Sequence, residues 1–250
     1  MTSHLSAGIE DLITRAVADA AAPHFFRKPL IGFSSADDPL FDEIVRQVGS
    51  HHLKPRDILP EAATVISFFI PFTKTLVASN KGDGPVSDDW GNSYVQGNEI
   101  INGVNQRLSE YLESQGLKCG FVPATHTFDA KTLKAGWSHR SAAAVAGLGG
   151  FGLNRMLMGP GGCAGRYGTA FTSARLQPSR PLAELQCLYL KNKKCAACVK
   201  ACPVGALTED GFDRHKCYQR LLENDKLLSA DGRLRDVCGK CVAACPLAVK

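Results

Sequence analysis

The 250-residue chain contains no apolar run long enough to cross a bilayer as a helix. Its longest apolar stretch, around Val65 to Phe72, has only the length of a strand. The first twenty residues lack the basic start of a secretion signal and the twin arginine of an export signal, and they carry acids inside their apolar pattern. We therefore expect a cytoplasmic protein without a membrane partner.

Acidic residues are absent from residues 130–183, although the whole chain has 24 of them. The basic residues of that stretch are Lys131, Lys134, Arg140, Arg155, Arg166, Arg175 and Arg180. Such a stretch forms either a solvated basic face or a surface that binds an anion. A nucleic-acid partner is not expected, because no basic stripe interleaved with aromatic residues occurs.

Helix-like and strand-like patterns alternate over the first 186 residues, and the composition, 44% hydrophobic and 21% charged, is that of a folded protein. The patterns predict helices over 6–21, 39–48, 99–115 and 138–148, and strands over 64–70, 118–123 and 167–176. A stretch rich in Gly, Asp and Ser, 79–93, predicts a long loop. This mixture indicates an α/β or α+β layered domain over residues 1–186, followed by a second unit over residues 187–250.

Ten cysteines in a chain without an export signal indicate metal or redox chemistry rather than disulfides. Eight lie in the second unit, in which two runs end in Cys-Pro. The runs are Cys195-x2-Cys198-x3-Cys202-Pro203 and Cys238-x2-Cys241-x3-Cys245-Pro246. Bacterial ferredoxins carry C-x2-C-x2-C-x3-C-P, and the last cysteine of each run binds the other cluster. Here each run lacks its first cysteine, and Cys187 and Cys217 are the natural replacements.

Crossing the last ligands in this way predicts two [4Fe-4S] clusters. The first would use Cys187, Cys195, Cys198 and Cys245, and the second Cys202, Cys217, Cys238 and Cys241. A pair of zinc sites uses the same C-x2-C loops but does not explain the two C-x3-C-P endings. Cys119 and Cys163 are left over, and we expect both to be small buried hydrophobic residues.

A glycine segment, Ala146 to Gly152, comes before a Tyr167-Gly168-Thr169-Ala170-Phe171-Thr172 strand and the two Cys-Pro runs. In this order the chain resembles the superfamily of epoxyqueuosine reductases and reductive dehalogenases over about residues 60–247. The resemblance implies a nitroreductase-like domain that holds base-off cobalamin and a ferredoxin-like dicluster module that feeds electrons to cobalt. It implies cofactor contacts for Ala146, Gly147, Leu148, Gly149, Gly150, Gly152, Tyr167 and Gly168.

The chain departs from both branches of this superfamily. Epoxyqueuosine reductases have an aspartate thirteen residues before the glycine motif, where this chain has Leu133, with Asp129 four residues further off. They also carry a C-terminal helical-repeat domain for transfer RNA, which this sequence lacks, so a queuosine role is not expected. Dehalogenases usually carry an export signal and use a tyrosine acid, for which Tyr94 and Tyr167 are candidates.

Four residues are candidates for catalysis: Tyr94, Asp129, His139 and Arg140. An imidazole titrates near neutrality, so His139 beside Arg140 can protonate a substrate or hold an anion, although a solvated histidine at the start of a helix is an equal alternative.

Two other motifs are weaker. The segment Gly147-x-Gly149-x-x-Gly152 fits a dinucleotide fingerprint but follows a helical pattern and has no acidic partner for a ribose. Asp213-Arg214-His215 matches the D-x-H of base-on cobalamin proteins, but Tyr218 replaces the glycine of that motif, so we expect a solvated loop.

The sequence thus predicts an iron-sulfur oxidoreductase, cobalamin-dependent by resemblance, that reduces or reductively cleaves a small substrate, for which an anion is a candidate. Its partner would be a low-potential electron donor such as ferredoxin or flavodoxin. The alternative is a non-catalytic electron-transfer protein or a reductive activator of a corrinoid protein, and a flavin is another candidate occupant of the first domain. The sequence fixes neither the substrate nor the oligomeric state.

Overall fold

The computed structural model describes residues 2–20, 22, 24–124, 128–180 and 186–250. Its centre is a four-stranded antiparallel sheet in the order β1-β2-β8-β3. The strands are β1 (Leu30–Ser35), β2 (Thr64–Pro71), β3 (Cys119–Phe121) and β8 (Gly165–Thr172). All of β2 is buried, because it lies between β1 and β8 and both faces of the sheet are covered.

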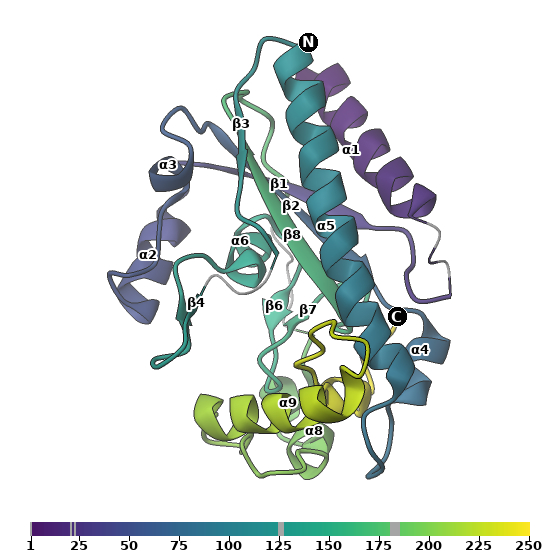
Figure 1. Cartoon of the computed structure of the whole chain (residues 1–250). Coiled ribbons are helices and arrows are strands. Elements are labelled where there is room, and N and C mark those ends of the chain that lie inside the picture. Colours follow the sequence, from purple (N-terminus) through teal and green to yellow (C-terminus); the bar gives the residue numbers. More distant parts are fainter. Residues whose placement is uncertain (1, 21, 23, 125–127, 181–185) are drawn as a thin grey trace.

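Alternate residues of β2 serve two separate packing layers. Ile66, Phe68 and Ile70 pack in the core that includes the long helices α1 (Thr2–Asp19) and α5 (Asp88–Ser114), which run side by side in Figure 1. Val65 and Phe69 pack in the clusters on the other face, which carry α6 (His139–Val145) and α2 (Pro39–Val48). The chain therefore forms the predicted mixed α/β layered fold.

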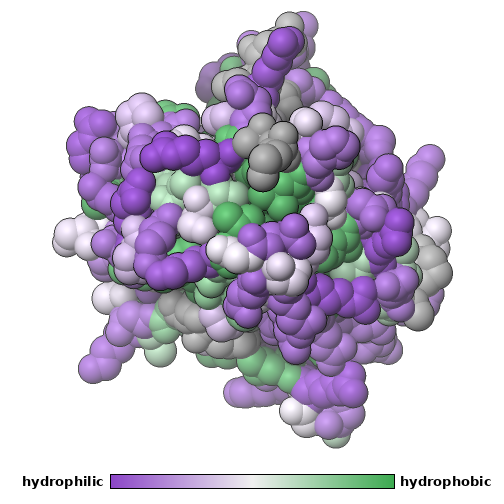
Figure 2. Space-filling view, turned by 90° about the horizontal axis from the view of Figure 1, so that it is seen from above, coloured by the Kyte–Doolittle hydropathy of each residue, from purple (hydrophilic) through white to green (hydrophobic). Residues whose placement is uncertain are grey.

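The remaining short elements frame the edges of these layers. They are α3 (Pro55–Ile58), α4 (Lys74–Ser79), the hairpin of β4 (Phe128–Asp129) and β5 (Lys134–Ala135), and the hairpin of β6 (Gly150–Phe151) and β7 (Leu157–Met158). Seen from above, the hydrophobic residues of the visible face gather in its middle and hydrophilic residues surround them (Figure 2). No described helix is long and apolar enough to span a membrane.

The predicted loop over 79–93 is too long, because α5 already begins at Asp88. The Ser87 hydroxyl caps this helix by accepting a hydrogen bond from the Trp90 amide at 3.2 Å. Two glycines of α5 make room for arginines from distant parts of the chain. A Cβ at Gly91 would lie 3.0 Å from Arg235 Cδ, and one at Gly97 would lie 2.8 Å from Arg166 Cγ. Gly91, one of the glycines that suggested a loop, is therefore a packing position within a helix, and so is Gly97 further along α5.

The cysteine-rich unit contains α7 (Leu188–Asn192), α8 (Ala197–Lys200), α9 (Arg214–Leu228) and α10 (Lys240–Ala243). It lies at one end of the sheet, below β6 and β7 in Figure 1. The buried Lys240 donates to the carbonyls of Asn80 and Pro85, at 3.2 and 3.0 Å. The tail beyond Cys245 returns to the first domain, where Ala164 N donates to Ala248 O at 2.9 Å. The predicted boundary at 186–187 follows directly on 181–185, which lie outside the described residues.

Candidate functional site

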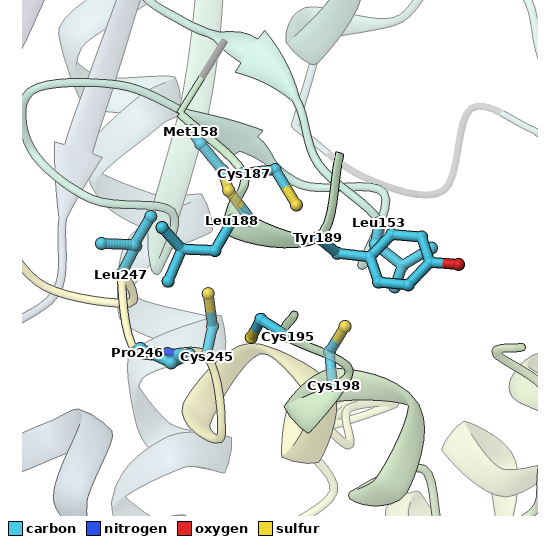
Figure 3. Close-up of a pocket in the computed structure, with 10 residues that line it drawn as sticks. All are labelled: Leu153, Met158, Cys187, Leu188, Tyr189, Cys195, Cys198, Cys245, Pro246 and Leu247. Carbon is cyan, nitrogen blue, oxygen red and sulfur yellow. The ribbon is translucent and has the colours of Figure 1, made fainter. Parts of the chain in front are cut away.

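Four cysteines from three segments of the cysteine-rich unit line one small cavity (Figure 3). Cys187 precedes α7, Cys195 and Cys198 lie at the start of α8, and Cys245 follows α10. The rest of the lining is formed by Leu153, Met158, Leu188, Tyr189, Pro246 and Leu247. The structure therefore brings together, in a largely apolar setting, the four cysteines that the crossed pairing assigns to the first cluster.

The other four cysteines also lie close to one another. Burial and the nearby thiols of Cys238, Cys217 and Cys202 raise the pKa of Cys241 to about 12. Burial, followed by Cys238 and Cys202, raises the pKa of Cys217 to about 11. These thiols are near enough to raise one another's pKa, and Cys198 of the first set also contributes to the raised pKa of Cys241, so the division into two ligand sets stays a prediction.

The spacing of the cysteine side chains bears on which metal group they could hold. Among the described residues, no three His, Cys, Asp or Glu side chains lie close enough together to hold one metal ion. A zinc ion needs its four ligands within about 2.3 Å of a single centre, whereas a cubane is held at its corners by ligands that stand further apart. The burial that disfavours free thiolates here would be offset by the positive charge of iron.

A second, larger cavity of about 540 Å³ lies between the sheet and the cysteine-rich unit, within the range of small-molecule and cofactor sites. Tyr94, His139, Arg140 and Tyr167 of the predicted site residues line it. Cys217 lines it too, so the second cysteine set borders this cavity directly. Its other lining residues are Phe128, Leu133, Ala135, Trp137, Ser138, Met156, Gly165, Arg166, Phe212, Arg214, Tyr218, Leu221 and Asp236.

The ring of His139 is positioned by the Thr169 hydroxyl. Trp137 Nε1 donates to the Thr169 hydroxyl at 2.9 Å, and His139 Nδ1 lies 2.8 Å from the same oxygen. The hydroxyl oxygen can accept from Trp137 and still either donate to Nδ1 or accept from Nδ1–H, so this contact fits both tautomers of the ring, which also has a hydrogen bond with the Pro123 carbonyl. Burial, followed by the charge of Arg166, lowers the pKa of His139 to about 4, although the Pro123 carbonyl opposes this. The imidazole is therefore neutral near pH 7 and is a poor proton donor.

Two arginines of the acid-free stretch meet in the cavity. Arg140 Nη1 donates to Arg155 O at 2.9 Å and to Met156 Sδ at 3.4 Å. Solvent reaches Arg140 through the cavity, but the surrounding protein still lowers its pKa. Burial also lowers the pKa of Arg166, Tyr94 and Asp236 raise it, and the like charge of Arg140 lowers it again. With Arg214 the lining holds three arginines against one carboxylate, that of Asp236, which favours an anionic ligand.

Asp129, the remaining catalytic candidate, is exposed and is not among the residues that line the cavity. Its carboxylate accepts hydrogen bonds from the amide and hydroxyl of Thr132, both at 2.7 Å, which lower its pKa and close the β4–β5 turn. Leu133, at the position where the resemblance expects an aspartate, lines the cavity with a φ of 53°. An acid at the expected place is thus replaced by an apolar side chain.

None of the described lining residues comes from the glycine segment 146–152. A Cβ at Gly149 would lie 2.6 Å from the Met158 carbonyl oxygen, so this glycine lets β7 approach closely. A Cβ at Gly168 would lie on the opposite face of β8 and would meet the Phe68 ring. Tyr167 lines the cavity, but its hydroxyl is occupied as a donor to Leu157 O at 3.0 Å. The cofactor role of the segment stays a prediction.

Two arginines of this cavity and one threonine outside its lining were not among the candidates drawn from the sequence. Arg166 and Arg214 line it, and the first could have been suspected from the acid-free stretch. Thr169, which orients His139, carried no signal in the sequence. The expected solvated loop at Asp213 is instead the start of α9, where the Asp213 carboxylate accepts from the amides of His215 and Lys216, both at 3.0 Å.

No protein-family model and no curated protein matches this chain. Solved structures do. An epoxyqueuosine reductase from Bacillus subtilis is 20% identical, with a TM-score of 0.59 over 96% of this chain and 66% of its own. The enzyme from Streptococcus thermophilus is 18% identical, with a TM-score of 0.59 over 94% of this chain and 65% of its own.

A catabolic reductive dehalogenase is 15% identical, with a TM-score of 0.62 over 88% of this chain and 30% of its own. This chain thus spans just under two thirds of the length of the epoxyqueuosine reductases and a smaller part of the dehalogenase. At these identities the likeness concerns the fold. The chain has the fold that epoxyqueuosine reductases and reductive dehalogenases share.

Proposed function

We propose that this chain is an iron-sulfur oxidoreductase that uses base-off cobalamin to reduce a small anionic molecule in the 540 Å³ cavity. One observation carries the proposal: Cys217, from the second cysteine set, lies in the wall of the cavity that also holds Tyr94 and Arg140. An electron relay would then end where a substrate can bind. Of the solved structures with this fold, one dehalogenase was described as suggesting a mechanism for B12-dependent dehalogenation.

The groups that could coordinate cobalt from this cavity are already engaged. His139 Nδ1 lies 2.8 Å from the Thr169 hydroxyl, and Met156 Sδ accepts from Arg140 at 3.4 Å. Cys217 belongs to the second cysteine set. These contacts favour a cobalamin without a protein ligand to its metal. When bound, the clusters and the cobalamin would supply single electrons and a strongly reducing centre.

The residues of the chain itself would bind the substrate and supply one proton. Arg140 and Arg166 would hold an anionic group by charge-assisted hydrogen bonds. Tyr94 is the best candidate for the proton donor, because the Arg166 guanidinium lies 4.6 Å from the centre of its ring and would stabilise the phenolate left behind. The apolar side chains of Phe128, Leu133 and Trp137 would exclude water from the same space.

The electrons would come from a low-potential donor protein such as ferredoxin or flavodoxin. The alternative function, a non-catalytic electron carrier or an activator of a corrinoid protein, needs the two clusters but no substrate cavity. The experiment must therefore separate cluster binding from corrin binding.

Anaerobically reconstituted protein should contain about eight iron and about eight acid-labile sulfide per chain. It should retain stoichiometric cobalamin on gel filtration and give a base-off cobalt(II) EPR signal. Replacing Ala135 by Trp fills the cavity from the β4–β5 hairpin, so it should abolish corrin retention at unchanged iron content. Lys131→Trp, an exposed position on the same hairpin, is the matched control. Cluster-replete protein that retains no corrin would favour the electron carrier, and protein without iron would end both proposals.

A further inference from the structure

Leu188 lies between solvent and the first cysteine set. Its side chain lines the cavity that holds the four cysteines of this set (Figure 3), and the residue is also 37% exposed. Leu190, on the same short helix α7, is 39% exposed. Single exposed leucines are common on protein surfaces, but these two face solvent next to a predicted set of cluster ligands. An electron donor seated on Leu188 would be separated from that set by one side chain.

Positive charge lies beside these leucines. The sequence has no acidic residue in 187–208. The exposed Lys193 and Lys194 follow α7 and come directly before the first Cys-x2-Cys loop. Lys193 ends the helix in a left-handed conformation, with a φ of 59°, and its Nζ lies 4.5 Å from the centre of the Tyr189 ring. Against these lysines stands the carboxylate of Glu209, which accepts from the Tyr189 hydroxyl at 2.8 Å.

The α7 surface consists of Leu188, Leu190, Lys193 and Lys194. We propose that it docks an acidic electron-donor protein, because an apolar centre with a basic rim fits a partner of opposite charge. Electron-transfer encounters use small interfaces, so few side chains suffice. This proposal rests on the proposed function, since the first cysteine set must hold a cluster that receives the electron. Electrons would enter there and leave toward the substrate at Cys217, so that the two sets act in series.

Two other surfaces of the cysteine-rich unit fit this role less well. On α9 the exposed Leu227 follows Lys226, but neither residue lines the cavity of the first set or the 540 Å³ cavity. Lys200 lines a hollow of about 290 Å³ together with Cys238, two further basic residues and Asp83. A donor bound in that hollow would reach the second set directly and leave the first set without a task.

The test is the rate at which cluster-replete protein oxidises a reduced plant-type [2Fe-2S] ferredoxin, followed by anaerobic stopped-flow absorbance. One electron moves in each encounter: the ferredoxin is oxidised, this chain is reduced, and no proton or leaving group takes part. Lys193→Glu combined with Lys194→Glu should slow the reaction about tenfold at low salt, and added salt should shrink the difference. Leu190→Ser should slow it about threefold at every salt concentration, because apolar contact area is lost.

Two controls separate docking from other effects of charge. Lys216→Glu combined with Lys226→Glu makes the same change of charge on α9, at exposed positions, and should alter the rate by no more than about twofold. Reduced methyl viologen is a cation, so the α7 double variant should be reduced by it at least as fast as the wild type. If that variant loses its clusters, Leu190→Ser decides the question.

Several results would overturn the docking proposal and leave the proposed function intact. They are an unchanged ferredoxin rate in the α7 double variant, an equal loss in the α9 double variant, a larger loss in Lys200→Glu, and slower reduction of the α7 double variant by methyl viologen. Cluster-replete wild type that the ferredoxin cannot reduce would overturn it as well. Wild-type protein without clusters would overturn the proposed function, and the docking proposal with it.

Discussion

His139 Nδ1 lies 2.8 Å from the hydroxyl oxygen of Thr169, which also accepts a hydrogen bond from Trp137. The three side chains come from α6, from β8 and from the residue before the Ser138 cap of α6. In the sequence, a histidine beside an arginine is a candidate proton donor. In the structure, burial and the charge of Arg166 lower its pKa, so the ring is neutral near pH 7.

We predict that the His139 imidazole does not titrate between pH 5.5 and 8, because its pKa is lowered to about 4. Two-dimensional NMR of the ring nitrogens, assigned by comparison with His139→Gln, measures this directly. A ring that titrated near pH 6.5 would contradict the lowered pKa and the burial that causes it.

The same lowered pKa has a consequence for stability. Between pH 6.5 and 4 the unfolded chain binds a proton that the folded chain does not, so stability falls as the pH is lowered. From pH 7 to pH 5 the wild type should lose about 2 kcal/mol more than His139→Gln in anaerobic urea unfolding. Parallel pH profiles of the two proteins would contradict this.

Arg140 should make the cavity selective for anions. Benzoate is a suitable probe, since a dehalogenase with this fold was solved in complex with 3-bromo-4-hydroxybenzoic acid. Arg140→Gln should weaken benzoate binding about 10-fold to 100-fold, as expected for a lost charge-assisted hydrogen bond, and should leave binding of the neutral benzamide unchanged. Titration calorimetry with both compounds measures this.

Arg155→Gln is the matched control for the benzoate experiment. The exposed Arg155 side chain is also basic but is not among the cavity-lining residues, and only its carbonyl contacts Arg140. Equal losses for benzoate and benzamide in Arg140→Gln would mean that the variant changed the shape of the cavity rather than its charge.

Single cysteine substitutions should separate the two clusters. Cys187→Ser removes a ligand of the first set and Cys217→Ser one of the second, so each should lower the iron content from about eight toward about four per chain. The double variant should lose nearly all iron, whereas Cys119→Ser should lose none. Iron and sulfide analysis decides this, and full iron content in Cys187→Ser would show the pairing to be wrong.

The glycine segment should matter for folding even without a cofactor. Gly149→Ala places a Cβ against the Met158 carbonyl, so β7 must move and the melting temperature should fall. Gly103→Ala in α5 meets no atom within 4 Å, and it should raise the stability by about 0.5–1 kcal/mol. Calorimetry of both variants without corrin tests this, and an unchanged melting temperature for Gly149→Ala would leave cofactor contact as the reason for that glycine.

The elements predicted well from the sequence carry their own local signals. The helix over 39–48 has apolar residues at helical spacing, a cap at Asp38 and a glycine at Gly49, and α2 occupies the same residues. The strand over 64–70 was equally clear, because β-branched and aromatic residues end at a proline. The resemblance to the two reductase groups is confirmed at the level of the fold.

What the sequence did not reveal depends on contacts between distant segments. The helical glycines Gly91 and Gly97 are explained only by Arg235 and Arg166, which come from far along the chain. The convergence of Tyr94 with Cys217 needs the sheet topology and the placement of α9. Cys163 is buried, as expected, but nothing near it in the sequence places its backbone against Leu247 and Ala248. The cluster ligands and the cofactor contacts remain predictions.

Leu247 and Ala248, which follow Cys245, pair with Cys163 and Ala164 of the first domain. We expect this contact to connect the iron content of the protein with its resistance to proteolysis. The first cluster would hold Cys187 and Cys245, close to the two ends of the cysteine-rich unit, so its release would loosen both ends at once. Lys240 is buried and bound to Asn80 and Pro85 only while that unit stays docked. We expect trypsin to cut after Lys240 in iron-depleted protein and to spare it in the cluster-replete form, which mass spectrometry of the fragments can follow. A cell short of iron would then degrade the empty chains and keep the loaded ones.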